Sequence, residues 1–352
     1  MNHTAFNTNT SSCGNSLHSI NPANISSDLR AVLIVRIVVN GLTCPLIIVL
    51  NILVMVAVKT RPQLRTKSNI SLACLSTTDL TVGLVLQPLY IAKESLLLKG
   101  DIMYCTTETT ISNTAVTFIC LLASFHHLVL MSAERYVAIK HLFVYETQVT
   151  EVRIIMASVL AWAAAIIISF VGLPPTAILI ASETLLIILP IYFNVSVYKE
   201  VRRNKNKIAA NQVSLETKEK LLKKKNAFYT TVIVLIVILL CYIPTNICSV
   251  ILISFKERIP PNIMVTALFT LTLFPVLNSL FNPLIYAFRI SYFRLAFIQL
   301  LSRKTISQAE ELEKKIFRSR QIGVNGNVNT GQGNHTLNNE RETTRQAEMH
   351  SR

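Results

Sequence analysis

The chain has 352 residues, of which 51% are hydrophobic and only 15% are charged, and its mean hydropathy is +0.47. Soluble domains carry about 25% charged residues, so this composition excludes an ordinary soluble enzyme and a disordered protein. The cysteines lack the paired spacing of a zinc site. The net charge of +15 is compatible with nucleic-acid binding, but the position of the charge along the chain argues against that partner.

Seven apolar segments follow one another along the chain. Each reaches the roughly 20 residues that a helix needs to cross a bilayer, so the sequence predicts an all-α bundle of seven transmembrane helices. The fourth and fifth segments are nearly continuous, and Pro174 and Pro175 divide them because consecutive prolines end a helix. The expected spans are 31–58, 68–92, 107–139, 153–173, 176–199, 226–254 and 262–287.

Most of the 34 basic residues fall in segments that share one side of the membrane if residues 1–30 lie outside. Because cytoplasmic loops are rich in Lys and Arg, we expect an extracellular N-terminal tail in a plasma-membrane protein. The basic inner loops would face anionic membrane lipid. Sequons at Asn2, Asn9 and Asn24 predict glycosylation of that tail, which lacks the apolar segment of a cleavable signal peptide.

The C-terminal part follows the seventh span. Residues 291–302 mix apolar and basic residues at helical spacing, which predicts a short amphipathic helix at the membrane surface. The polar segment 303–352 has little to bury and is expected to be a disordered cytoplasmic tail. The predicted organisation is therefore a tail at 1–30, a receptor-like helical domain at 31–302 and a second tail at 303–352.

Polar residues inside a membrane span are costly and are therefore functional candidates. They form motifs that follow one another in a fixed order along the chain. These are LSTTD ending at Asp79, Glu134-Arg135-Tyr136, Pro190 with Tyr198, CYIP with Tyr242 and Pro244, and NSLFNPLIY from Asn278 to Tyr286. In this order, each in its own span, they make residues 31–302 resemble a rhodopsin-like (class A) G-protein-coupled receptor.

The resemblance implies a receptor without enzymatic activity, which binds an outside ligand and activates a heterotrimeric G protein by conformational change. An arrestin and a receptor kinase are the other implied partners, through phosphorylation of the tail. Arg135 would pair with Glu134 while inactive; the alternative is an arginine that only reaches toward the membrane surface. The implied coupling and activation residues are Glu134, Arg135, Tyr136, Tyr198, Tyr242, Pro244, Asn282, Pro283 and Tyr286.

The resemblance also implies an allosteric sodium site and no other cofactor. Its residues would be Asp79, Ser124, Asn278 and Asn282. A lone buried carboxylate either takes a counter-ion or becomes protonated. The alternative is thus a protonated Asp79 that joins helices by hydrogen bonds.

The chain departs from the family pattern in two places. Tyr242 and Ile238 replace the usual Trp and Phe of the sixth helix, and Phe125 replaces an aliphatic residue of the third. The pair Phe125 and Ile238 suggests that an aromatic ring has moved from the sixth helix to the third at similar total volume. The usual outer disulfide has no second cysteine, so Cys105 either pairs with Cys13 or stays free. The missing loop and disulfide resemble the melanocortin, lysophospholipid, cannabinoid and adenosine receptor group.

Two ligand classes are disfavoured, because Thr117 and Val276 stand where amine receptors have Asp and visual pigments have Lys. Glu183 could meet a cationic ligand group, a neighbouring helix or interfacial water. The ligand itself, a small molecule, lipid or peptide, stays open. The other expected ligand residues are Thr117, Lys93, Glu94, Thr245, Asn246 and Ser249.

Three further residues and two rival functions stay open at this point. Arg36 either reaches outward or faces the bundle, and His126 and His127 are expected to make interhelical hydrogen bonds or to pack against lipid. A transporter is one rival, although the chain lacks the internal repeats typical of transporters. A non-signalling, receptor-like interaction partner is the other.

Overall fold

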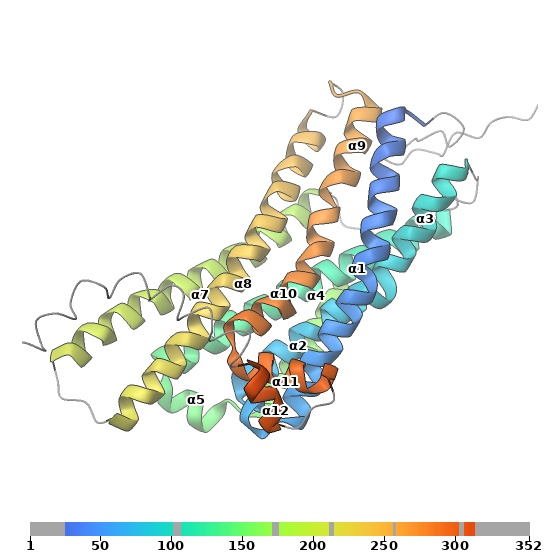
Figure 1. The fold of residues 1–352 in the computed structure, drawn as a ribbon. Coiled ribbons are helices and arrows are strands. Elements are labelled where there is room, and N and C mark those ends of the chain that lie inside the picture. Colours follow the sequence, from blue (N-terminus) through green and yellow to red (C-terminus); the bar gives the residue numbers. More distant parts are fainter. Residues whose placement is uncertain are drawn as a thin grey trace, which may run out of the picture. The chain divides into compact units, whose positions relative to one another are not determined.

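The structure, a computed structural model, describes residues 25–100, 107–170, 176–210, 215–255, 258–302 and 306–313. Within these ranges every regular element is helical. The chain divides into two units, Met1–Ile290 and Ser291–Arg352. Figure 1 labels helices of both units, although α6 (Glu151–Phe170), η1 (Pro62–Leu64) and η2 (Val82–Leu86) carry no label there.

The first unit is an all-α bundle of seven long helical stretches, as predicted from the sequence. Contacts between its helices link α1 to α2 and α3, α4 to α6 and α7, and α8 to α10 (Figure 1). The stretches are α1 (Ser27–Thr60), α2–η2–α3 (Lys67–Thr81, Val82–Leu86 and Gln87–Lys99), α4 (Thr107–Lys140), α6 (Glu151–Phe170), α7 (Thr176–Ala210), α8 (Leu215–Ser254) and α9–α10 (Pro261–Leu271 and Leu273–Arg289). Two short helices, η1 (Pro62–Leu64) and α5 (Leu142–Gln148), lie in the loops.

Six of these stretches are long and apolar enough to cross a membrane within the described residues. They agree with six of the seven predicted spans to within a few residues at most ends. The fifth predicted span forms α7, which contacts α4 and α8 but is not among the six. The side chains of 176–183 lie outside the described residues.

The second helical stretch contains a π-helical turn, η2, which ends two residues before Pro88. Proline lacks an N–H and its ring crowds the carbonyl four residues earlier, and a π-turn is a common local response to a disturbed helical ladder. Gly83 in this turn lies against α1, where an added Cβ would approach Ile48 Cγ1 to 2.9 Å. The small residue thus allows α1 and the second stretch to approach closely.

The second unit holds α11 (Ser291–Ser302) and α12 (Ile306–Glu313), which contact each other. The bounds of α11 agree with the predicted amphipathic helix. Disorder was predicted from residue 303, and this does not hold for the eight residues of α12. The rest of that tail lies outside the described residues.

Candidate functional site

The inner end of α4 carries a buried charged pair. Glu134 and Arg135 are both less than a tenth exposed, and Arg135 Nε lies 3.4 Å from Glu134 Oε2. Ser68, at the start of α2, donates to Glu134 Oε1 at 2.9 Å and accepts a hydrogen bond from Arg135 Nη1. The predicted pairing of these two residues is therefore present, and a serine from another helix holds both partners.

Tyr145 of α5 completes this arrangement. Its hydroxyl donates to Glu134 Oε1 at 2.6 Å. Burial and the negative charge of Glu134 both raise the pKa of the Tyr145 phenol, so it stays protonated and able to donate. Lys67 Nζ donates to the Tyr145 carbonyl at 3.0 Å and lies 4.7 Å from its ring centre, which attaches α5 to the start of α2.

Sequence reasoning missed both hydroxyl groups of this inner clamp, defined here as Glu134, Arg135, Ser68 and Tyr145. The available signal for Tyr145 was one aromatic hydroxyl in a short polar loop that follows the Glu-Arg-Tyr motif. That signal is weak because it does not say which helix the tyrosine meets.

The remaining switch residues are distributed along the bundle. Tyr136 packs against Phe193 of α7, with ring centres 5.4 Å apart, while Tyr198 is 51% exposed. In the described part of the chain no hydrogen bond joins Tyr198 to Arg135. Pro244 lies inside α8, and Pro283 and Tyr286 are buried in α10.

Tyr242 and Phe125 form the aromatic contact between α8 and α4. Both side chains are buried, and their ring centres lie 4.6 Å apart at an interplanar angle of 54°. Such tilted pairs add to the free energy of apolar burial. The side chain of Ile238, the other partner of the suggested exchange, lies outside the described residues.

Asp79 lies at the centre of the bundle and is fully buried. Asn282 Nδ2 donates to Asp79 Oδ2 at 2.8 Å. The Oδ1 atoms of Asn278 and Asn282 are buried without a hydrogen-bond partner, and Ser124 donates to Thr78 at 3.3 Å. A buried carboxylate bonded to an asparagine whose amide oxygen is itself unsatisfied suits a hard monovalent cation, because such ions prefer oxygen ligands.

His127 joins α4 to α6 through a hydrogen bond to Ser158. Its Nδ1 lies 2.7 Å from the Ala123 carbonyl and its Nε2 lies 2.6 Å from Ser158 Oγ, and its ring meets the edge of Trp162. His126 bonds only to the carbonyl of Leu122 in its own helix among the described contacts. The expectation of interhelical hydrogen bonds is thus confirmed for His127.

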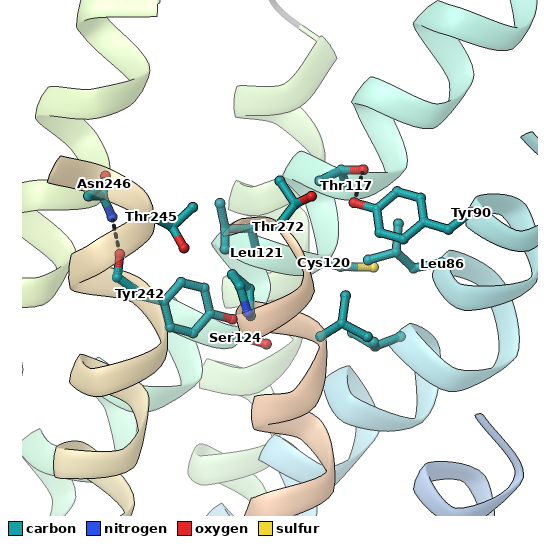
Figure 2. Close-up of a pocket in the computed structure, with 13 residues that line it drawn as sticks. Leu86, Tyr90, Thr117, Cys120, Leu121, Ser124, Tyr242, Thr245, Asn246 and Thr272 are labelled. Carbon is teal, nitrogen blue, oxygen red and sulfur yellow. Dashed lines mark hydrogen bonds between the residues drawn. The ribbon is translucent and has the colours of Figure 1, made fainter. Parts of the chain in front are cut away.

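A cavity of about 80 Å³ lies between the second, third, sixth and seventh stretches (Figure 2). Three residues expected to meet a ligand line it, namely Thr117, Thr245 and Asn246. The Tyr90 hydroxyl lies 3.0 Å from Thr117 Oγ1, and Asn246 donates to the Tyr242 carbonyl at 3.3 Å (Figure 2). The described lining is apolar with hydroxyl and amide groups and contains no charged side chain.

Other expected ligand residues lie elsewhere. Ser249 donates to the Thr245 carbonyl within α8 and, like Lys93, is not part of the described lining. Glu183 belongs to α7, but its side chain lies outside the described residues. So do Asn2, Asn9, Asn24, Cys13 and Cys105, which leaves the predicted glycosylation and disulfide outside the described chain.

Glu94 pairs with Arg36, a partner that sequence reasoning did not assign. Arg36 faces the bundle, only 2% exposed, and its Nη2 lies 2.6 Å from Glu94 Oε1. Of the two alternatives for Arg36, the inward one is therefore correct.

Comparison with protein families supplies the deciding observation. Residues 50–175, from the inner half of α1 to the end of the fourth stretch, match the model of the seven-transmembrane receptors of the rhodopsin family. This match, over 126 of the 352 residues, supports a receptor of this family. The receptor is accordingly a multi-pass membrane protein, and the buried Glu134–Arg135 pair lies within the matched residues.

Proposed function

We propose that this receptor binds an extracellular ligand in the cavity beside Tyr90 and Thr117 and activates a heterotrimeric G protein at its inner face. The receptor promotes nucleotide exchange on the G protein by conformational change and not by covalent chemistry. The inner clamp is the observation that carries the proposal. A buried arginine held by an acid and by the Ser68 hydroxyl, with the Tyr145 hydroxyl bonded to the same acid, has a defined resting arrangement, from which movement of the helices can release it.

The centre of the bundle offers a connection between cavity and clamp. Val276 lines the cavity and lies on α10 with Asn278, Asn282 and Tyr286. Asn282 bonds to Asp79, so a movement of α10 reaches the second stretch directly. Asp79, Asn278 and Asn282, with Ser124 nearby, would hold a sodium ion that favours this packed arrangement.

The membrane setting completes the proposal. The receptor lies in the plasma membrane with residues 1–30 outside, glycosylated at Asn2, Asn9 and Asn24. Its basic inner loops face anionic lipid. A receptor kinase and an arrestin act on the C-terminal tail, where phosphorylation adds charge that pairs with basic residues.

The test is ligand-independent nucleotide exchange on a panel of G proteins, measured at matched surface expression. We expect exchange above that of cells without the receptor, and its loss in Arg135→Ala. Arg65→Ala is the matched control, because the side chain of Arg65 makes an exposed ion pair with Glu151 and no other bond among the described contacts. A transporter would give uptake without exchange. A receptor-like partner would give no exchange on any G protein, also during a ligand-library screen.

A further inference from the structure

The seventh helical stretch is interrupted at Thr272, between α9 and α10. Pro275 lies three residues beyond this point and lacks the N–H that the Leu271 carbonyl would accept in a continuous helix. The proline ring also crowds that carbonyl. The interruption therefore has a local covalent cause, and it is distinct from the effect of Pro283 further along α10.

A side chain from another helix satisfies the freed carbonyl. Thr245 of α8 donates to the Leu271 oxygen at 3.2 Å. Buried backbone oxygens are rarely left without a donor, because an unmade hydrogen bond in an apolar setting is costly. The break in the seventh stretch is thus joined to the sixth.

Arg36 of α1 holds the outer side of the same break. Its Nη1 donates to Thr272 Oγ1 at 2.7 Å and to the Phe269 carbonyl. Its Nε and Nη2 both meet Glu94 Oε1, at 2.7 and 2.6 Å. The planar guanidinium can make both sets of bonds at once, since its donors point in several directions. Figure 1 shows α9 beside the outer part of α1, and contacts link the two helices.

The Arg36–Glu94 pair adjoins the cavity without being part of its described lining. The Arg36 guanidinium carbon lies 5.2 Å from the centre of the Tyr90 ring, and both Tyr90 and Thr272 line the cavity (Figure 2). Thr245 and Pro275 line it as well. Hence Thr245 and Thr272, the two side chains that take part with Arg36 in the bonds at the break, both line the space assigned to the ligand.

A buried ion pair by itself is weak evidence for stability, because the cost of removing two charges from water can exceed their attraction. The additional bonds of Arg36 to Phe269 and Thr272 attach the ion pair to the interrupted part of the seventh stretch. We propose that Arg36 is a positioning residue of the ligand pocket, which fixes the break of the seventh helix and thereby places Thr272 and Tyr90 in the cavity wall. The signalling consequence rests on the proposed function, whereas the positioning does not.

The discriminating variant is Arg36→Lys. A lysine keeps the charge opposite Glu94, but its compact ammonium lacks the planar fork that spans Glu94 and the seventh helix together. Thr272→Val is a second variant, which removes the acceptor hydroxyl and leaves Arg36 unchanged. Thr270→Ala is the control for the melting temperature and for basal exchange, because Thr270 is exposed on α9 and bonds only to Thr266 of its own helix among the described contacts.

The first measurement is conformational. Purified receptor in nanodiscs carries a fluorine probe on Thr270→Cys, and the spectrum of probe-treated protein without this cysteine is subtracted. We expect one dominant signal in the otherwise wild-type protein and two populations in Arg36→Lys and Thr272→Val. If both variants give the single dominant signal of the otherwise wild-type labelled protein, that result overturns the proposal. A lower melting temperature with an unchanged spectrum would do the same, since it would reveal a merely structural pair.

The second measurement is a double-mutant cycle. Pro275→Ala restores an amide for the Leu271 carbonyl, so the helix closes without outside support. In that background Arg36→Lys should have less than a third of its effect on the probe populations; additive effects would contradict the proposal. Basal nucleotide exchange should change at least threefold in Arg36→Lys. If the wild type shows no exchange while the populations still shift, the positioning role stands and the proposed signalling function fails.

Discussion

The hydroxyl of Tyr145 donates to the carboxylate of Glu134 across 2.6 Å, which connects the loop helix α5 to the inner end of α4. Since Glu134 also accepts from Ser68 and pairs with Arg135, the tyrosine bears on the resting position of the arginine. This relationship provides a direct test of the inner clamp.

Tyr145→Phe removes one hydrogen bond and leaves the aromatic ring in place. A hydrogen bond to a charged group contributes about 1.5–3 kcal/mol. If about 1 kcal/mol of this is lost only in the resting state, basal nucleotide exchange rises about fivefold. The measurement is basal exchange at matched surface expression, with Phe143→Leu as control because Phe143 is exposed on the same loop helix. Equal exchange in Tyr145→Phe and wild type would show that the tyrosine does not hold the clamp.

Asp79→Asn tests the sodium site. The amide keeps the shape of the side chain but lacks the charge that attracts a cation, so sodium should no longer lower basal exchange or agonist affinity. Sodium chloride is compared with choline chloride at equal ionic strength. The control is Asp28→Asn, because Asp28 is exposed in the first turn of α1. A sodium effect that persists in Asp79→Asn would place the ion elsewhere.

Lys224→Glu tests a missing restraint of the sixth helix. In many receptors of the family, the arginine that corresponds to Arg135 is held by an acid at the position where this chain has Lys224. The side chain of Lys224 lies outside the described residues. A lysine side chain that approached Arg135 from an exposed face would repel it by a few tenths to about 1 kcal/mol. We expect appreciable basal signalling in the wild type, reduced up to about fivefold in Lys224→Glu. The alternative is that Glu134 and its hydroxyl partners suffice, and silence of both proteins without ligand would support it.

The aromatic contact between Phe125 and Tyr242 invites a paired exchange. Phe125→Ile alone leaves space beside Tyr242 and should lower stability by about 1–2 kcal/mol, with a corresponding loss of signalling. Adding Ile238→Phe returns a ring to the interface at similar total volume. The melting temperature and agonist-free exchange of the double variant should return toward wild type. Losses that simply add would refute the exchange.

The sequence by itself determined the helical spans and the resemblance to the receptor family. Hydropathy belongs to each segment alone, so the spans from 31–58 to 262–287 were readable before any packing was known. The break between the fourth and fifth spans followed from Pro174-Pro175 for the same local reason. Motif order then placed Asp79, Glu134-Arg135 and Asn282-Pro283 in their helices, and the matched residues 50–175 include the first two of these motifs.

Only the tertiary structure decided which polar groups meet. Arg36 in an apolar helix could have faced either lipid or protein, and its partner Glu94 belongs to α3 while its other acceptors lie on the seventh stretch. Ser68 and Tyr145 joined Glu134 for a similar reason. The direction of a side chain depends on which face of each helix turns inward, and this is set by close packing at points such as Gly83 against α1. Such contacts join residues far apart in the chain, so no local pattern encodes them.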